Sequence, residues 1–323
     1  MYSYIVVLSL VAWAHGLDPE VQEKFEKLPR DDFVVYFNNK NFTWKIKNNN
    51  FIDEKIMSSV ELRSVDVPLK IKSVENRDSV SGIPKEYNVA EHLARTGICL
   101  FIDDYEQARN CSSSWAISAV GVAADRQCMR LANDIYRSSV QFLILQFSQF
   151  DLTCCKKCSS KSFCTGGSPE EALLFYLRSG LVGSGCKRKL PDHEACVEAC
   201  DDPDEYYLAN KWFGESIYIM PEDDREIRRD ISTNGPLLAI FKVYEDFKDY
   251  SSGIYEHTHG KLLGYHSVKV IGFGEDDGTP YWLAVNSWGG YWGESGRVKI
   301  KRGQANVDFE KRMVGVIPRA HFH

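Results

Sequence analysis

The chain has 323 residues, which at about 150 residues per domain is enough for two compact units with a buried core. Hydrophobic residues make up 44% and charged residues 26%, close to the averages of soluble globular proteins, so disorder and fibrous repeats are excluded. Lys and Arg number 39 against 45 acidic residues, a net charge of -6. We expect no nucleic-acid partner, because phosphate binding needs a concentrated positive surface.

The most apolar run, residues 5–14, is about half the length of roughly 20 residues that a membrane-spanning helix needs. Small residues at positions 12–16 supply a cleavage site, so residues 1–16 are predicted to be a secretory signal peptide and no membrane span is expected. The signal predicts a secreted, extracellular or lysosomal protein.

Residues 17–82 are rich in Asn, Lys and Asp, contain no Cys, and differ in composition from the Cys-rich region that follows. This change of composition predicts a separable pro-segment. Asn41, Phe42 and Thr43 form a sequon, so Asn41 is a candidate glycosylation site in a secreted protein.

All ten cysteines lie between Cys99 and Cys200. An even number in an oxidising compartment indicates five disulfides. Cys155 and Cys158 have the spacing of a zinc half-site, and Cys196 and Cys200 could supply the other half. We favour disulfides over a metal site, because oxidation competes with metal binding outside the cell.

Two helices are predicted in the middle of the chain. Residues 114–129 lack Pro, are rich in small apolar residues and follow serines that can cap a helix. Residues 168–171 form a capping box with Pro at the first helical position, and Gly180 ends the second helix.

After residue 235 the pattern changes to short alternating or β-branched runs separated by glycine-containing turns, which predicts antiparallel hairpins. The expected strands are residues 237–244, 267–273, 281–286 and 297–301. The fold class is therefore α+β, with a helical half at about residues 99–200, a β half at about 235–318 and a cleft between them.

The motif Cys-Ser-Ser-Ser-Trp at residues 111–115, directly before the first helix, resembles the signature of papain-family peptidases. Further motifs of that family follow in order at residues 164–167, 264–267 and 286–289. The resemblance covers roughly residues 84–319. It implies a papain-like peptidase domain over residues 83–323, with two subdomains and no cofactor or metal.

Within that family the chain is similar to cathepsin B, most clearly at residues 124–128, 277–283 and 315–319 and in the doublet Cys154-Cys155. The resemblance implies a pairing that uses every cysteine: Cys99–Cys128, Cys111–Cys164, Cys154–Cys196, Cys155–Cys158 and Cys186–Cys200. The loop between Cys186 and Cys196 is short and has one histidine, His193, so removal of C-terminal dipeptides is not implied.

The chain departs from the family at the reacting group, because Ser114 occupies the position of the nucleophilic cysteine. The resemblance makes His266 the base and Asn286 the residue that orients it. A hydroxyl cannot form the thiolate that a neighbouring imidazolium and a helix N-terminus stabilise. The family's oxyanion glutamine also falls on Ala108, with Gln107 one residue away, and losing such a donor costs roughly 10²–10³ in rate.

A third departure is Ser112, where the family has Gly. Substrate-binding positions implied by the resemblance are Gly166, Gly167, Trp288 and Arg312. Trp288 shields the His–Asn pair. Arg312 replaces an acid on a pocket floor, so the sequence predicts a preference for acidic or apolar side chains there.

The leading hypothesis is a secreted cathepsin B-like protein that has lost most or all peptidase activity and acts by binding. Its expected partners are a peptide or protein in the cleft, cystatin-type inhibitors and its own pro-segment. One alternative is an active endopeptidase, either a slow hydrolase using Ser114 and His266 or a cysteine protease with an introduced serine. Another is a structural matrix module without a ligand.

Overall fold

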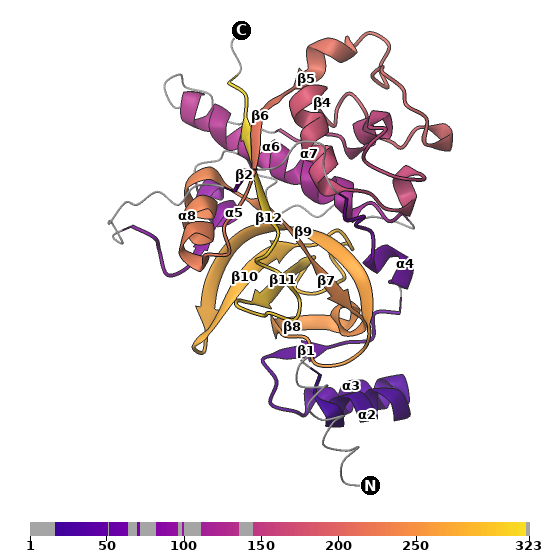
Figure 1. Ribbon diagram of the computed structural model, residues 1–323, viewed down its shortest axis with the longest axis vertical. Coiled ribbons are helices and arrows are strands. Elements are labelled where there is room, and N and C mark those ends of the chain that lie inside the picture. Colours follow the sequence, from indigo (N-terminus) through magenta and orange to yellow (C-terminus); the bar gives the residue numbers. More distant parts are fainter. Residues whose placement is uncertain are drawn as a thin grey trace.

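The computed structural model describes residues 17–50, 52–63, 70–71, 82–95, 99, 111–135 and 145–320. A helical half and a sheet half lie against each other, and the N-terminal segment runs along one side of both (Figure 1). This is the α+β arrangement that the sequence predicts. Within the described ranges, no helix combines the length and the apolar character needed to cross a bilayer. The predicted signal peptide, residues 1–16, lies outside them.

The helical half is built on two helices, α6 (Ser114–Ile135) and α7 (Pro169–Arg178). α6 extends beyond the predicted end at residue 129, because the next residues include neither Gly nor Pro. α7 begins as predicted: the Oγ of Ser168 accepts from the backbone N–H of Glu171. The other short elements of this half are η1 (Gln149–Cys154), η2 (Phe163–Thr165), β4 (Leu181–Val182), η3 (Asp192–Glu194), η4 (Tyr207–Asn210) and β5 (Lys211–Trp212).

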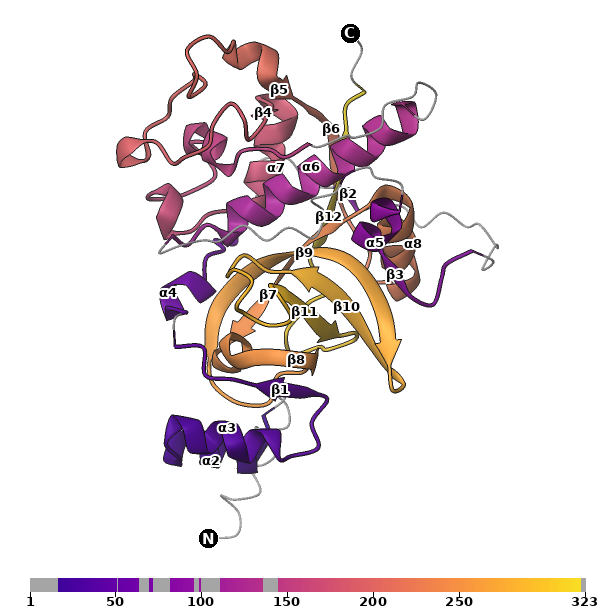
Figure 2. The same cartoon turned by 180° about the vertical axis from the view of Figure 1, so that it is seen from behind.

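The sheet half contains ten strands in the order β1-β8-β11-β10-β9-β7-β12-β6-β2, with β3 paired to β9. Their bounds are β1 (Trp44–Ile46), β2 (Lys70–Ile71), β3 (Tyr87–Asn88), β6 (Gly214–Ile219), β7 (Leu237–Tyr244), β8 (Tyr250–Tyr255), β9 (Leu262–Asp276), β10 (Thr279–Val285), β11 (Arg297–Lys301) and β12 (Met313–Pro318). The short turn η5 (Glu245–Asp249) joins β7 to β8, and α5 (Val89–Ala94) and α8 (Asp224–Asn234) lie beside the sheet (Figure 2).

The strand predictions hold for β7 and β11, whereas β9 is longer than the predicted run and β6 joins the sheet from before residue 235. The predicted antiparallel hairpins are confirmed: β9 pairs antiparallel with β7 and with β10, and β10 with β11. The sheet as a whole is mixed. β8 pairs with β11, and β2 with β6, in parallel. These pairs form because the curved sheet brings together strands that are not consecutive in the chain, which local alternation does not encode.

A buried polar network joins α6 to the sheet half. Arg126 of α6 donates from Nη2 to Asp230 at 2.6 Å and from Nη1 to the Tyr218 hydroxyl at 2.6 Å. Arg126 and Asp230 have side chains only 1% and 0% exposed. The charge of each therefore depends on its partner, since an unpaired buried charge is very costly.

The five disulfides are the pairs that the resemblance implies: Cys99–Cys128, Cys111–Cys164, Cys154–Cys196, Cys155–Cys158 and Cys186–Cys200. All ten cysteines of the chain are therefore oxidised. The zinc alternative fails, because the four sulfur atoms it requires are bonded to other sulfurs rather than present as thiolates. Among the described residues, the grouping Cys186, Cys200 and Glu205 has metal-like spacing, but both of its cysteines form one disulfide.

The N-terminal segment forms α2 (Pro19–Lys27), α3 (Arg30–Asn38), β1 and α4 (Glu54–Met57). β1 pairs with β8, and α2 and α3 lie below the sheet, so the segment extends the sheet half (Figure 1). Its aromatic residues are part of the main hydrophobic core, with Phe33, Phe37 and Trp44 at most 1% exposed. The segment then continues from α4 toward the junction of the two halves.

Candidate functional site

Ser114 is the first residue of α6 and is fully buried. The turn before it is fixed by the Cys111–Cys164 disulfide and by the backbone N–H of Ser112, which donates to the Cys164 carbonyl at 3.0 Å. Trp115 packs behind the turn and donates from Nε1 to the Phe163 carbonyl at 3.3 Å. The Ser114 hydroxyl therefore occupies a fixed position at the positive end of a long helix.

His266 comes to Ser114 from the sheet half. It lies on β9 opposite Phe241 of β7, and its Nδ1 is 3.2 Å from the Ser114 Oγ. Its Nε2 is 2.9 Å from the Oδ1 of Asn286, which follows β10. The three predicted catalytic residues are thus brought together from three elements into one hydrogen-bonded chain.

The direction of these hydrogen bonds follows from Asn286. The backbone N–H of Ser287 also donates to its Oδ1, at 2.9 Å, and an N–H can only face an acceptor. The Nε2 of His266 must then carry the proton that it donates to the same oxygen, which leaves Nδ1 as the acceptor for the Ser114 hydroxyl. This is the tautomer that a general base acting on Ser114 requires.

Burial lowers the pKa of His266 to about 4, although hydrogen bonds with Asn286 and the backbone of Met57 act in the opposite direction. The imidazole is therefore neutral near pH 7. A neutral imidazole beside a hydroxyl is a different electrostatic state from a thiolate–imidazolium pair.

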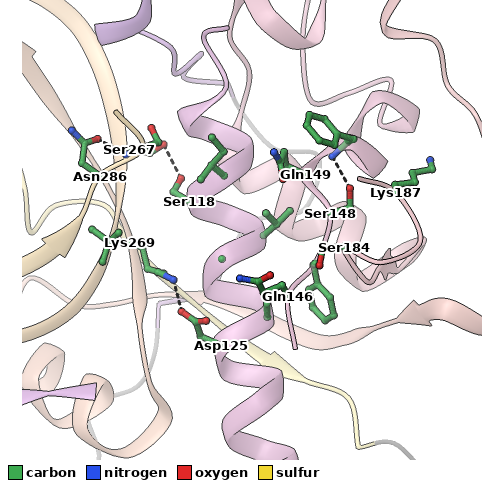
Figure 3. A pocket seen from close by; sticks show the side chains of 18 of the residues that line it. Ser118, Asp125, Gln146, Ser148, Gln149, Ser184, Lys187, Ser267, Lys269 and Asn286 are labelled. Carbon is green, nitrogen blue, oxygen red and sulfur yellow. Dashed lines mark hydrogen bonds and ion pairs between the residues drawn. The ribbon is translucent and has the colours of Figure 1, made fainter. Parts of the chain in front are cut away.

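Trp288 covers the histidine, with its ring centroid 4.8 Å from that of His266. A cavity of about 340 Å³ with both polar and apolar lining residues lies along one face of α6 and reaches Asn286 (Figure 3). Ser118 donates to the Oγ of Ser267 at 2.9 Å on one wall, and Lys269 pairs with Asp125 at 2.7 Å on another. The predicted oxyanion candidates, Gln107 and Ala108, lie outside the described residues.

The N-terminal segment occupies the cleft in front of Ser114. The backbone N–H of Gly167 donates to Ser59 at 3.0 Å, and that of Glu61 donates to Gly167 at 2.8 Å. Val60, between them, forms a parallel bridge with Gly167 and donates to the Tyr265 carbonyl at 3.1 Å. The segment is thus bound like an added strand along the cleft wall formed by Gly166 and Gly167, here called the glycine wall.

Two serines of the 111–115 motif, Ser112 and Ser114, contact this segment. The Ser112 Oγ donates to the Lys55 carbonyl at 2.9 Å. The Ser114 Oγ is in hydrogen-bond contact with the Oγ of Ser59, which is 1% exposed. The Ser114 hydroxyl is therefore covered by the N-terminal segment.

Gly166 and Gly167 lie so close to neighbouring atoms that there is little room for a Cβ at either position. Gly166 has φ of 112°, and a Cβ there would lie 3.0 Å from the Ser59 carbonyl oxygen. A Cβ on Gly167 would lie 2.7 Å from both the Cys158 carbonyl oxygen and the Trp115 ring. A side chain at Gly166 would therefore crowd the bound segment, and one at Gly167 would clash with the helical half behind it.

Arg312 makes a bidentate ion pair that the sequence analysis did not anticipate. Its Nε and Nη2 donate to the two carboxylate oxygens of Glu170 at 2.9 and 3.0 Å. Glu170 is 1% exposed. The charge of Arg312 is neutralised by this partner, so the predicted attraction for an acidic side chain at this position loses its basis.

Three residues at the site gave no recognisable signal in the sequence. Ser59 and Val60 lie in a segment with no motif, and only the folded chain places them in the cleft. Glu170 was visible only as part of a helix cap.

Asn41, the predicted glycosylation site, is exposed in the N-terminal segment.

Residues 88–317 match the model of the papain family of cysteine proteases. The chain belongs to this family. Cathepsin B-like cysteine proteinase 6 of Caenorhabditis elegans is 31% identical over 93% of this chain and 86% of its own length. The gut-specific cysteine proteinase of the same organism is 34% identical over 76% of this chain and 77% of its own.

Solved structures agree with these relatives. Procathepsin B S9 from Trypanosoma congolense has a TM-score of 0.77 and 28% identity, covering 91% of this chain and 99% of its own. Digestive procathepsin L2 from Tenebrio molitor, at 21% identity and a TM-score of 0.66, shares the fold over 93% of this chain and 91% of its own. Within the papain family the chain is therefore cathepsin B-like, and it resembles pro-forms in which a pro-segment is present.

Proposed function

We propose that this chain is a secreted or lysosomal, cathepsin B-like protein that binds peptides in its cleft and does not cleave them. The observation that carries the proposal is the hydroxyl of Ser114 at the reacting position, in a chain whose ten cysteines are all in disulfides. With no thiol present, no thiolate can form. In other hydrolases, removing the nucleophile costs up to about 10⁶ in rate.

The contacts of the pro-segment support binding as the remaining activity. The cleft holds an extended chain by backbone hydrogen bonds on the glycine wall and buries the side chain of Val60 to 9% exposure. A peptide or a cystatin-type inhibitor would enter after the pro-segment leaves. Because a chain without peptidase activity cannot process itself, a second protease would have to cut between the pro-segment and residue 83.

A serine hydrolase is the second candidate, because Ser114, His266 and Asn286 form a hydrogen-bonded chain with distances of 3.2 and 2.9 Å. In this candidate His266 takes the proton of Ser114 while the hydroxyl oxygen attacks the peptide carbonyl.

Hydrolysis of a panel of fluorogenic dipeptide substrates separates the two candidates. The chain is assayed before and after a second protease has cut its pro-segment, beside Ser114→Cys and His266→Ala variants. No turnover by the unmodified chain is the expected result. Turnover that disappears in His266→Ala would refute the binding-only proposal.

The Ser114→Cys variant tests the rest of the site. Strong activity would mean that the hydroxyl alone prevents catalysis. A silent variant would indicate that Ser112 and the region of Gln107 and Ala108 have changed as well.

A further inference from the structure

A second cavity, of about 650 Å³, opens beside the cleft in the helical half. Its described lining comes from α6, from residues 152–163 and from η3. Its lining includes Ser159, Ser160 and Ser162, and the buried aromatic residues Trp115 and Phe163 lie beneath it. The cavity is therefore lined mainly by polar groups.

The cavity lining carries two positive charges. Lys156 and Lys161 line the cavity and are exposed, as is His193. Among the described residues, neither lysine has a carboxylate within ion-pair distance. Glu194, the acidic residue of the described lining, accepts from the backbone N–H of Cys164 at 3.3 and 3.4 Å. The cavity thus offers two ammonium groups without an acidic partner in the described part of the chain.

The walls of the cavity are held rigidly. The disulfides Cys155–Cys158 and Cys154–Cys196 fix the lysine-containing loop and the segment after η3. His193 and Glu194 both have φ of 54°, a left-handed conformation that is uncommon for residues other than glycine. Backbone strain of this kind is held by surrounding structure and is typical of binding sites.

The same loop already binds one carboxylate. Ser160 donates from Oγ to the Oε1 of Glu61, in the pro-segment, at 2.7 Å. Burial raises the pKa of Glu61, but hydrogen bonds from Ser160 and Arg63 outweigh it and hold this pKa below its ordinary value. The loop therefore favours an ionised acidic side chain at the edge of the cavity.

We propose that this cavity binds an acidic peptide segment, with its carboxylates at Lys156 and Lys161. The described lining belongs to the helical half, and among the described residues the pro-segment touches it through the bond between Glu61 and Ser160. The inference deepens the proposed function, on which it rests, because it names the class of peptide that the chain would hold without cutting.

The test uses the full chain and a fluorescein-labelled peptide of alternating Glu and Leu, with fluorescence anisotropy as the readout. We expect saturable binding that weakens at least about tenfold in the Lys156→Gln, Lys161→Gln double variant, and that falls as ionic strength rises. A Lys70→Gln, Lys85→Gln variant removes the same charge from exposed lysines elsewhere and should bind as the parent does. A peptide with Gln in place of Glu should bind at least about tenfold more weakly.

If the two double lysine variants bound the peptide equally well, or if the Glu and Gln peptides bound equally well, the proposed site would be refuted. A sulfated polysaccharide that binds more tightly than the peptide, with the same dependence on Lys156 and Lys161, would overturn the peptide assignment. Mass spectrometry of the probe after incubation separates the two proposals. A cut probe would contradict the binding-only function while leaving the lysine dependence of binding as evidence for the site.

Discussion

Acidification should weaken the docking of the pro-segment through His259, a histidine buried under its aromatic residues. The His259 ring lies 4.8 Å from Phe25, 4.9 Å from Phe33 and 5.5 Å from Phe37, between ring centroids. Burial lowers its pKa to about 4, although Asp246 acts in the opposite direction. When the pro-segment leaves, the ring regains water and its pKa returns toward the ordinary value of 6.5.

The sign and size follow from linkage. The released state binds a proton near pH 6.5 and the docked state only near pH 4, so acid favours release in the window between these values. On going from about pH 7 to pH 5, protonation of His259 weakens docking by about 1.8 kcal/mol, which is roughly 20-fold in the docking equilibrium.

Other titratable groups face the same site. Burial raises the pKa of Asp249 to about 6 against its pairing with Arg30 of the pro-segment. This carboxyl takes up a proton more readily in the docked state, so over the same pH range it favours docking by about 1.3 kcal/mol. The His257 ring is hydrogen-bonded to Asp246 at 3.0 Å, and Glu245 also lies close to His259.

The opposing contributions make His259→Phe informative. This variant keeps an aromatic ring in the site and removes the titrating group. In the parent the two opposing contributions leave a net weakening of docking by about 0.5 kcal/mol, whereas in the variant we expect acid to strengthen docking by about 1.3 kcal/mol through Asp249. The measurement is the hydrogen-exchange protection of residues 30–46 at pH 7 and pH 5, corrected for intrinsic exchange. His92→Phe, at an exposed histidine of α5, is the matched control. An unchanged pH response in His259→Phe would refute the reasoning.

Three further outcomes are expected. Ser112→Gly should weaken pro-segment docking by about 1 kcal/mol, because the hydrogen bond from the Ser112 hydroxyl to the Lys55 carbonyl is lost. Unchanged hydrogen exchange at residues 54–57 would contradict this. Asp230→Asn should lower the free energy of unfolding in urea by about 3–5 kcal/mol, since Arg126 would remain buried without its partner, whereas a loss below about 1 kcal/mol would mean that water reaches the pair. Gly253→Ala would place a Cβ 2.3 Å from the Thr43 carbonyl oxygen, so exchange at residues 44–46 should rise while that of α6 stays unchanged.

The sequence by itself determined the local elements. Ser168, Pro169 and Gly180 define the limits of α7, because capping, a fixed φ and a positive φ of 72° act within one turn of the chain. The limits of β7 and β11 follow from alternation for the same reason. The motif residues Ser114, His266 and Asn286 could be assigned as one site through family resemblance, although their spacing alone gave no distance.

Only the tertiary structure decided which distant groups meet. Arg312 is 142 residues from Glu170, and neither residue indicates a bidentate pair until the fold brings the turn before β12 to the first turn of α7. Ser59 and Val60 have no local pattern that marks a cleft ligand, and His259 has no sequence feature that predicts an aromatic enclosure by residues more than 200 positions away. Periodicity and caps act over a few residues, whereas these contacts depend on chain closure and on burial, which together set the charge states of the site.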